Sequence, residues 1–343
     1  IASCLVGSEM CIRDSYLAVD FFFMLSGFVI GYAYDDRWNR MTVGPFFKRR
    51  IIRLHPMVIM GSIVGAAFFY FQESPCFPPI ENTSVGTMLL VMLLGCTLLP
   101  LPLKFDIRGW TEMHPLNGPA WSLYYEYIGN ILYALFVRKF NKVALSVLVF
   151  VAGCFTVYRC LTAPAGDIVG GWALNWEQQY VGMVRLMYPF FGGLLLSRLG
   201  WLIRLEKRAF WWCSLLIVVV LSIPRIGGED GYWMNGLYEA FCIICVFPVI
   251  VSMGAGGKVT GKRSTAVCKF LGDISYPIYI THYPLVYTYT AWVCNNNATM
   301  VEGIPYMILT FVGAVVLAYA CLKLYDEPVR RWLTDRFLKG KKK

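Results

Sequence analysis

The chain has 343 residues, of which 57% are hydrophobic and only 15% are charged. An average soluble domain is about 25% charged, so this composition excludes a water-soluble globular fold. The net charge of +10 does not indicate nucleic-acid binding, because the Lys and Arg residues lie in short segments between apolar runs, where they act as signals of membrane topology. We therefore expect an all-α, polytopic transmembrane helical bundle, since lipid offers no partner to a bare peptide group.

Residues 1–15 differ from the rest of the chain. They begin without an initiating Met, are too polar to span a membrane and have no amphipathic period. They also resemble a translated sequencing-adapter tract, and we interpret Ile1–Ser15 as foreign, with a short native tail as the alternative. The membrane domain is then expected to cover 16–325, followed by a basic cytoplasmic tail over 326–343.

Apolar runs of about 15 to 24 residues recur from Tyr16 onward, and a helix needs about 20 such residues to cross a bilayer of about 30 Å. They predict about nine spans, at 16–34, 52–72, 119–137, 143–161, 181–199, 210–224, 238–254, 270–293 and 303–325. A further apolar stretch, 86–101, is short and ends in Pro100-Leu101-Pro102.

The basic residues indicate how the stretch 86–101 lies. Of the 31 Lys and Arg residues, 25 fall in five segments: 35–53, 138–142, 198–208, 255–270 and the tail from Lys323. All five lie on one side of the membrane only if 86–101 does not cross it. We therefore expect 86–101 to be re-entrant or interfacial, within a long outer region 73–118, and the C-terminus to be cytoplasmic.

The 12 cysteines lack the paired spacing of a zinc site, so no metal is expected. Cys76 and Cys294 fall in predicted outer loops, where they could pair.

Four motifs follow one another along the chain. They are Tyr16-Leu-Ala-Val-Asp20-Phe-Phe-Phe-Met-Leu-Ser26-Gly27, Phe46-Phe-Lys-Arg-Arg50-Ile-Ile-Arg53-Leu-His-Pro56, Leu116-Asn117-Gly-Pro-Ala-Trp121-Ser122-Leu-Tyr-Tyr-Glu126 and Leu271-Gly-Asp-Ile-Ser275-Tyr276-Pro-Ile-Tyr279-Ile-Thr-His282-Tyr-Pro284. In this order they resemble the membrane acyltransferase family 3, whose members O-acylate lipopolysaccharide, exopolysaccharide and other surface glycans. The resemblance implies an acyl-CoA donor, with acetyl-CoA as the expected form, and a multi-pass protein of the bacterial inner membrane.

Arg50 and Arg53 are three residues apart, so both guanidinium groups lie on one face of a helix. Arginine forks suit phosphate oxygens, and the resemblance implies that this pair binds the phosphates of acyl-CoA. From position alone, a positive-inside anchor at the cytoplasmic mouth of the second span is the alternative.

Glu126 lies 7 residues after Pro119, or about 10 Å along a helix. An acidic group inside a membrane is costly and usually faces a functional cavity. We expect a carboxyl suited to proton transfer, with a structural pair to a buried cation as the alternative. The resemblance makes Glu126 the catalytic or His-orienting carboxylate.

The family's other catalytic group is a His in its first helix, and no His precedes Tyr16 here. We interpret this as the loss of an N-terminal helix, so that the intact protein has ten spans and this chain as written lacks its general base. His282, within the fourth motif, is the remaining candidate for a catalytic His, with a packed structural His as the alternative.

Asp20 lies near the outer end of the first span and either binds acceptor hydroxyls or pairs with Arg185, another charge within a span. The tail from Asp326 reads as a cytoplasmic surface helix near anionic lipid, in a structural role. Further candidates for substrate binding or structural support are the motif residues Ser26, Asn117, Trp121, Ser122, Ser275 and Tyr276.

The hypothesis is therefore an acyltransferase that moves an acyl group from acyl-CoA, bound on the cytoplasmic side, to a hydroxyl of a surface or lipid-linked glycan at a carboxylate near the other side. The alternatives are a transporter or flippase of a lipid-linked saccharide, which should show inverted repeats, and a membrane scaffold without a catalytic centre. The sequence predicts membrane lipid as a partner. It does not indicate the oligomeric state.

Overall fold

The computed structural model describes residues 16–226 and 231–338. The segment that we interpret as foreign, 1–15, lies outside the described residues. The regular elements of the described chain are all helices, and one isolated antiparallel bridge joins Glu112 and Ala173 in the segments between them. The predicted all-α class is confirmed.

The first half of the described chain forms α2 (Leu17–Tyr34), α3 (Val43–Phe68), α4 (Val85–Gly95), α5 (Ala120–Leu135), α6 (Lys142–Thr162) and α7 (Trp176–Leu199). The second half forms α8 (Ala209–Leu221), α9 (Tyr232–Phe241), α10 (Phe247–Gly256), α11 (Lys262–Thr281), α12 (Tyr283–Asn296), α13 (Met300–Cys321) and α14 (Glu327–Phe337). Two π-helical turns, Cys242–Val246 and Leu322–Asp326, join α9 to α10 and α13 to α14 without a break.

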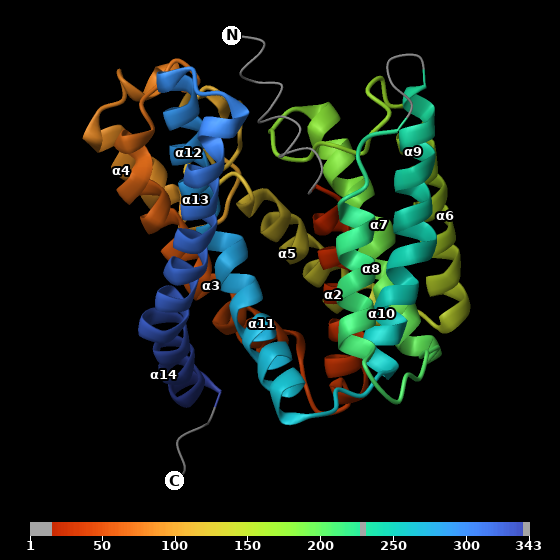
Figure 1. The fold of residues 1–343 in the computed structure, drawn as a ribbon. Helices are drawn as coiled ribbons and strands as arrows, with labels where there is room; N and C mark the ends of the chain where they lie inside the picture. Colours follow the sequence, from red (N-terminus) through yellow and green to blue (C-terminus); the bar gives the residue numbers. More distant parts are fainter. Residues whose placement is uncertain (1–15, 227–230, 339–343) are drawn as a thin grey trace.

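The helices form two groups with α5 slanting between them (Figure 1). One group contains α2, α6, α7, α8, α9 and α10, and the other contains α3, α4, α11, α12, α13 and α14. Helix α5 contacts α2 and α7 of the first group and α3 of the second. Helix α5 is therefore placed to contribute side chains to both groups at the centre of the molecule.

Six of the nine predicted spans are confirmed as helical segments long and apolar enough to cross a membrane. They are Leu17–Arg37, Val43–Gln72, Lys142–Thr162, Trp176–Leu199, Tyr232–Gly256 and Met300–Phe337. The other three predictions differ from the structure: 119–137 and 210–224 correspond to the shorter helices α5 and α8, and 270–293 is interrupted. The chain is a multi-pass membrane protein.

The predicted span 270–293 is divided at His282, where α11 ends and α12 begins. Pro284 lies in the first turn of α12 and has no backbone N–H to continue the hydrogen bonds of α11. The apolar run continued through this point, so hydropathy alone did not indicate the interruption.

Helix α4 has 11 residues, or about 16 Å of helix, which is half the thickness of the hydrocarbon core. Leu98, just after it, has a positive φ of 61° where the chain turns back. The prediction that 86–101 does not cross the membrane agrees with this short helix.

The predicted tail helix is not a separate surface element. Residues Met300–Phe337 form one helical segment of 38 residues, seen as a continuous blue rod in Figure 1. Because the π turn joins α13 to α14 directly, α14 is held in position and packs against α3.

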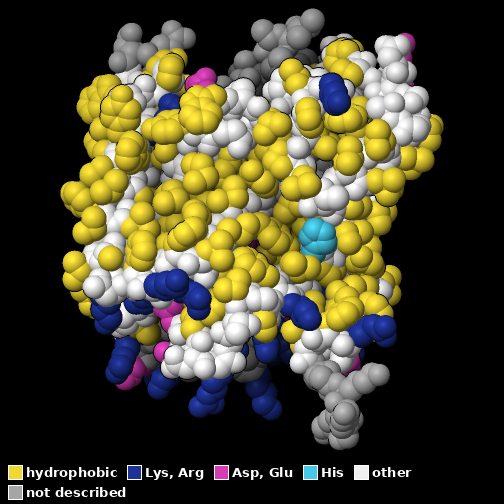
Figure 2. Space-filling view, turned by 180° about the vertical axis from the view of Figure 1, so that it is seen from behind, with side chains coloured by type: hydrophobic (Ala, Val, Ile, Leu, Met, Phe, Trp, Pro, Cys, Tyr) yellow, Lys and Arg dark blue, Asp and Glu magenta, His cyan; other side chains and the backbone are white. Residues whose placement is uncertain are grey.

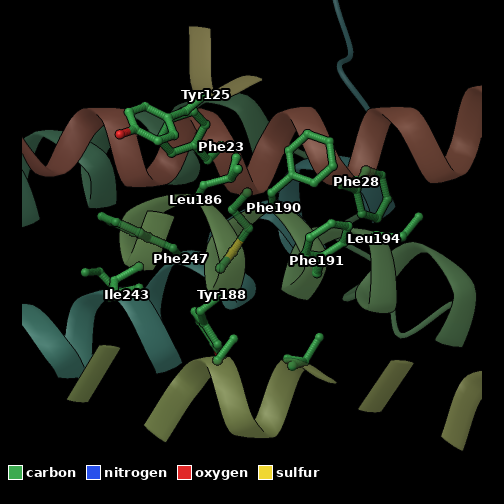
Figure 3. Packing of buried hydrophobic residues seen from close by; sticks show 14 of the residues in the cluster. Phe23, Phe28, Tyr125, Leu186, Tyr188, Phe190, Phe191, Leu194, Ile243 and Phe247 are labelled. Carbon is green, nitrogen blue, oxygen red and sulfur yellow. The ribbon is translucent and has the colours of Figure 1, made fainter. Parts of the chain in front are cut away.

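The core of the first group lies where α2 meets α7 and α10 (Figure 3). Phe23, Phe190, Phe191 and Phe247 are fully buried there. A Cβ on Gly27 would lie 1.8 Å from the carbonyl oxygen of Phe190, so only glycine lets the two backbones pack this closely.

The two ends of the molecule differ in charge. Figure 2 shows a broad apolar band, with Lys and Arg side chains gathered mainly below it, at the end where α14 lies in Figure 1. The predicted pair Cys76 and Cys294 forms a disulfide, with Cα atoms 6.3 Å apart. It joins the segment after α3 to the end of α12, at the opposite end of the molecule.

Candidate active site

A buried ion pair lies at the centre of the bundle. Arg50 Nη2 of α3 donates to Glu126 Oε1 of α5 at 2.5 Å, and their side chains are 3% and 2% exposed. Ser26 Oγ of α2 donates to the same carboxylate oxygen at 2.7 Å. One helix from each group, α2 and α3, therefore holds the same oxygen of the Glu126 carboxylate on α5.

We expected Arg50 at the cytoplasmic end of its span and Glu126 near the other side of the membrane. This prediction is wrong for Arg50, because its side chain contacts Glu126. Helix α3 begins at Val43, so Arg50 lies about 10 Å inside it rather than at its mouth. The chain before α5 enters the bundle, since Asn117 is buried, and this brings Glu126 to the level of Arg50. The alternative that Glu126 pairs with a buried cation is therefore observed.

Several buried polar atoms around this pair have no hydrogen-bond partner among the described residues. They are Glu126 Oε2, Arg50 Nε, the Tyr127 hydroxyl and Asn130 Oδ1. Asn130 Nδ2 is occupied, because it donates to the backbone carbonyl of Glu126 at 2.7 Å. Burying polar groups without partners costs free energy, so this region is suited to a polar ligand.

Helix α11 forms a second side of the site. The Tyr276 hydroxyl donates to the Leu54 carbonyl of α3 at 2.6 Å. One turn further along, the Tyr279 hydroxyl lies 2.5 Å from Ser122 Oγ and donates to the Pro119 carbonyl at 3.0 Å. The predicted residues Tyr276 and Ser122 are thus both close to the Glu126 region.

Sequence reasoning missed Tyr279. Its ring stacks on Phe22 of α2, with centroids 5.8 Å apart and planes at 10°. Phe22 precedes Ser26 by one helical turn, just as Ser122 precedes Glu126. Its place three residues after Tyr276 within the fourth motif was the available signal, since residues three apart share a helix face.

His282 lies at the break between α11 and α12 rather than deep within one span. Its Nδ1 lies 2.9 Å from the Ile278 carbonyl and 3.0 Å from the Tyr279 carbonyl. An Nδ1–H that donates to the backbone leaves Nε2 as the proton acceptor. His282 is six residues beyond Tyr276, or about 9 Å along the helix, so the structure does not bring it against Glu126.

Asp20 pairs with Arg185, as one of the two predicted alternatives stated. Arg185 Nη2 donates to Asp20 Oδ2 at 2.8 Å and to the Tyr16 carbonyl at 2.7 Å. Arg185 Nη1 donates to the Gly170 carbonyl at 3.0 Å, and the guanidinium lies 5.0 Å from the centre of the Trp121 ring. Asp20 and Trp121 therefore belong to a second buried cluster.

The remaining predicted residues divide between structural and exposed positions. Asn117 Nδ2 donates to the Ile280 carbonyl at 2.9 Å and ties the segment before α5 to α11. Ser275 is exposed and bonds to the Gly272 carbonyl of its own helix, so it does not face the site. Arg53 lies one helical turn from Arg50, but its side chain is exposed whereas that of Arg50 is buried.

A third polar cluster lies in the segment between α4 and α5, outside the spans. Glu112 accepts a hydrogen bond from the Tyr287 hydroxyl at 2.5 Å. Arg108, fully buried, donates instead to Gln72 at 2.7 Å and to the Pro115 carbonyl at 2.8 Å. Burial raises the pKa of the Glu112 carboxyl to about 7, although the charge of Arg108 opposes this shift. No sequence motif indicated this cluster.

Within residues 16–226 and 231–338, no group of three or more His, Cys, Asp and Glu side chains lies together to hold a metal ion. The polar groups that surround Glu126 are Arg, Ser, Tyr and Asn side chains.

A family model and one known protein match most of this chain, and a second known protein matches about a third of it. A family model described as an acyltransferase domain matches residues 11–322. Acyltransferase MdmB of Streptomyces mycarofaciens is 22% identical over 284 residues, covering 79% of this chain and 68% of that protein. "Protein 2 in picA locus" of Rhizobium radiobacter is 35% identical over 128 residues, covering 35% of this chain and 65% of that protein.

No solved structure matches the chain. The family match includes all four motifs and the residues of the central ion pair, and it covers far more than half of the sequence. The chain therefore belongs to acyltransferase family 3, the membrane acyltransferases.

Proposed function

We propose that this protein transfers an acyl group, in the first instance acetyl, from acyl-CoA to a hydroxyl group of a cell-surface or lipid-linked glycan. The observation that carries this proposal is the carboxylate of Glu126, held inside the bundle through one oxygen while its other oxygen has no partner among the described residues. A buried carboxylate fixed in this way is suited to accept a proton from a hydroxyl group.

The proposed reaction is direct acyl transfer. In place of the His that the family resemblance leads us to expect, Glu126 Oε2 takes the proton of the acceptor hydroxyl, whose oxygen attacks the carbonyl carbon of the thioester. The carbon–sulfur bond then breaks, and the proton passes from Glu126 to the departing thiolate of CoA. Arg50 and Ser26 keep the carboxyl group oriented through this cycle. His282, between α11 and α12, is proposed as a second proton acceptor through its Nε2.

The sidedness of the reaction rests on two features of the ends of the molecule. Positive residues gather at the end of α14, which is the cytoplasmic end by the positive-inside rule. The disulfide between Cys76 and Cys294 lies at the other end, and disulfides persist in an oxidising compartment such as the bacterial periplasm. We propose an inner-membrane protein that receives acyl-CoA at the cytoplasmic end, where Arg53 is exposed.

The test is acetyl transfer from radiolabelled acetyl-CoA to the glycan fraction in membranes that contain the protein. Glu126→Gln should lower the transfer at least about 100-fold, because an amide cannot take the proton. Glu126→Asp retains the charge and withdraws it by one methylene, so a smaller loss is expected. Full transfer by Glu126→Gln contradicts the proposal.

The matched control is Glu177→Gln. Glu177 lies exposed in the first turn of α7, so the same chemical change should leave transfer unaltered. Size-exclusion profiles of all three variants show whether the bundle remains folded, which matters because Glu126→Gln leaves the buried Arg50 without its anion.

A further inference from the structure

The donor site lacks one of its two expected arginines. Arg50 was expected to bind phosphate with Arg53, but it is buried and paired with Glu126. A CoA thioester carries several phosphate groups, and one exposed arginine leaves most of their charge without a partner. The structure supplies a second cation next to Arg53 from a part of the chain beyond the family match, which ends at residue 322.

That cation is on α14. Helix α14 packs against α3, and Lys48 Nζ of α3 lies 5.8 Å from the centre of the Phe337 ring of α14. Helix α3 runs away from the basic end and α14 runs toward it (Figure 1), so Arg53, five residues after Lys48, and Arg330, seven residues before Phe337, both lie about 8 to 10 Å from this contact in the same direction. The seam between α3 and α14 therefore brings Arg53 and Arg330 near the same place.

Arg330 is held in a defined orientation. Its Nη2 donates to Asp326 Oδ2 at 2.7 Å, and the Asp326 side chain is 2% exposed. Arg330 Nε and Asp326 Oδ1 are buried without a hydrogen-bond partner among the residues that the structure describes. Arg330 is therefore held through its Nη2, while its Nε–H is left to donate to a ligand.

Asp326 faces inward because of the π turn before it. The turn Leu322–Asp326 changes the phase of the rod, and π turns inside α-helices are frequent at functional sites.

We propose that Arg330, oriented by Asp326, joins Arg53 in binding the phosphate groups of the acyl donor at the seam between α3 and α14. This proposal rests on the proposed function, because it assumes a donor that carries phosphate. The same guanidinium chemistry also suits the phosphate headgroup of an anionic lipid, so the test includes both sources.

The test measures binding of CoA to the purified full chain by isothermal titration calorimetry. Arg330→Gln should weaken CoA binding about tenfold, which corresponds to the loss of about one charge-assisted contact. Arg331→Gln is the matched control, because Arg331 is the neighbouring residue, is 77% exposed and pairs with Glu327. It should leave the affinity within about twofold, since it removes the same charge away from the seam.

Arg330→Lys keeps the positive charge but loses the planar guanidinium group, so we expect an intermediate affinity for CoA. This variant also provides a measurement if Arg330→Gln does not fold. Pantetheine, which has no phosphate, should show no difference between wild type and Arg330→Gln. Native mass spectrometry of retained phosphatidylglycerol tests the lipid source. Loss of lipid in Arg330→Gln with unchanged CoA affinity overturns the proposal in favour of a lipid headgroup.

The outcomes separate this proposal from the proposed function. A wild-type protein that does not bind CoA overturns the donor assignment and this site together. A wild-type protein that binds CoA, with Arg330→Gln binding it equally well, overturns only the role of Arg330. Equal weakening by Arg330→Gln and Arg331→Gln also overturns it, because the effect is then one of net charge.

Discussion

Two buried arginine–carboxylate pairs lie in this bundle, and they differ in what remains unbonded. Arg185 and Asp20 share two hydrogen bonds, and the backbone carbonyls of Gly170 and Tyr16 accept two more from Arg185. Arg50 and Glu126 share one hydrogen bond, and each has a buried atom without a partner among the described residues. Burial of an ion pair therefore does not by itself indicate a site, whereas incomplete bonding around it does.

The largest effect that tests this difference between the two pairs is expected on the free energy of unfolding. Asp20→Ala leaves Arg185 buried without its anion, so we expect a loss of about 3–5 kcal/mol in the free energy of unfolding. Thermal unfolding of the purified protein measures this. Asp20→Leu combined with Arg185→Met removes both charges and should recover most of that loss. If Asp20→Ala is as stable as wild type and instead loses acyl transfer, the two pairs do not differ as described.

Glu112 sharpens the comparison, because it is a buried acid that bonds to Tyr287 while the nearby Arg108 bonds elsewhere. Its pKa is raised from 4.5 to about 7 by burial, so the folded state holds the proton more tightly than the unfolded state. Stability is then highest below about pH 4.5 and falls, by about 3 kcal/mol at most, as the pH rises to about 7.

Glu112→Gln stays neutral and should remove this part of the pH dependence, so the variant becomes more stable than wild type at pH 8 and equal to it near pH 4. Melting temperatures between these values measure it. Parallel curves for the two proteins would show that Glu112 does not titrate in this range.

A smaller effect is expected at the bond from Ser26 to Glu126. Ser26→Ala removes one donor from a charged acceptor, which costs about 1.5 kcal/mol, or roughly tenfold in acyl transfer. Ser146→Ala, at an exposed position of α6, is the matched control. Unaltered transfer by Ser26→Ala would show that Arg50 alone fixes the carboxylate.

Hydropathy and charge together predicted much of the fold. The long apolar helices, the short segment around α4 and the disulfide between Cys76 and Cys294 followed from run length and from the sidedness of the basic segments. The Asp20–Arg185 pair was also predicted as an alternative, because two charges within spans tend to find each other.

The depth of individual residues was not predictable in the same way. Hydropathy gives the apolar part of a helix, but α3 begins at Val43 among polar residues, which moves Arg50 into the bundle. The position of Glu126 depends on a buried segment before α5 and on the slant of α5, which are set by tertiary packing. The inward direction of Asp326 depends on a π turn that no residue pattern indicated.

The rod formed by α13 and α14 has a practical consequence for work on this protein. Its 38 residues extend about 57 Å, whereas the hydrocarbon core is about 30 Å thick, so a large part of it projects beyond the lipid. A fluorescent or affinity fusion partner joined directly after Phe337 would stand beside Lys48, next to the donor site that we propose. A long flexible spacer keeps such a partner away from that surface.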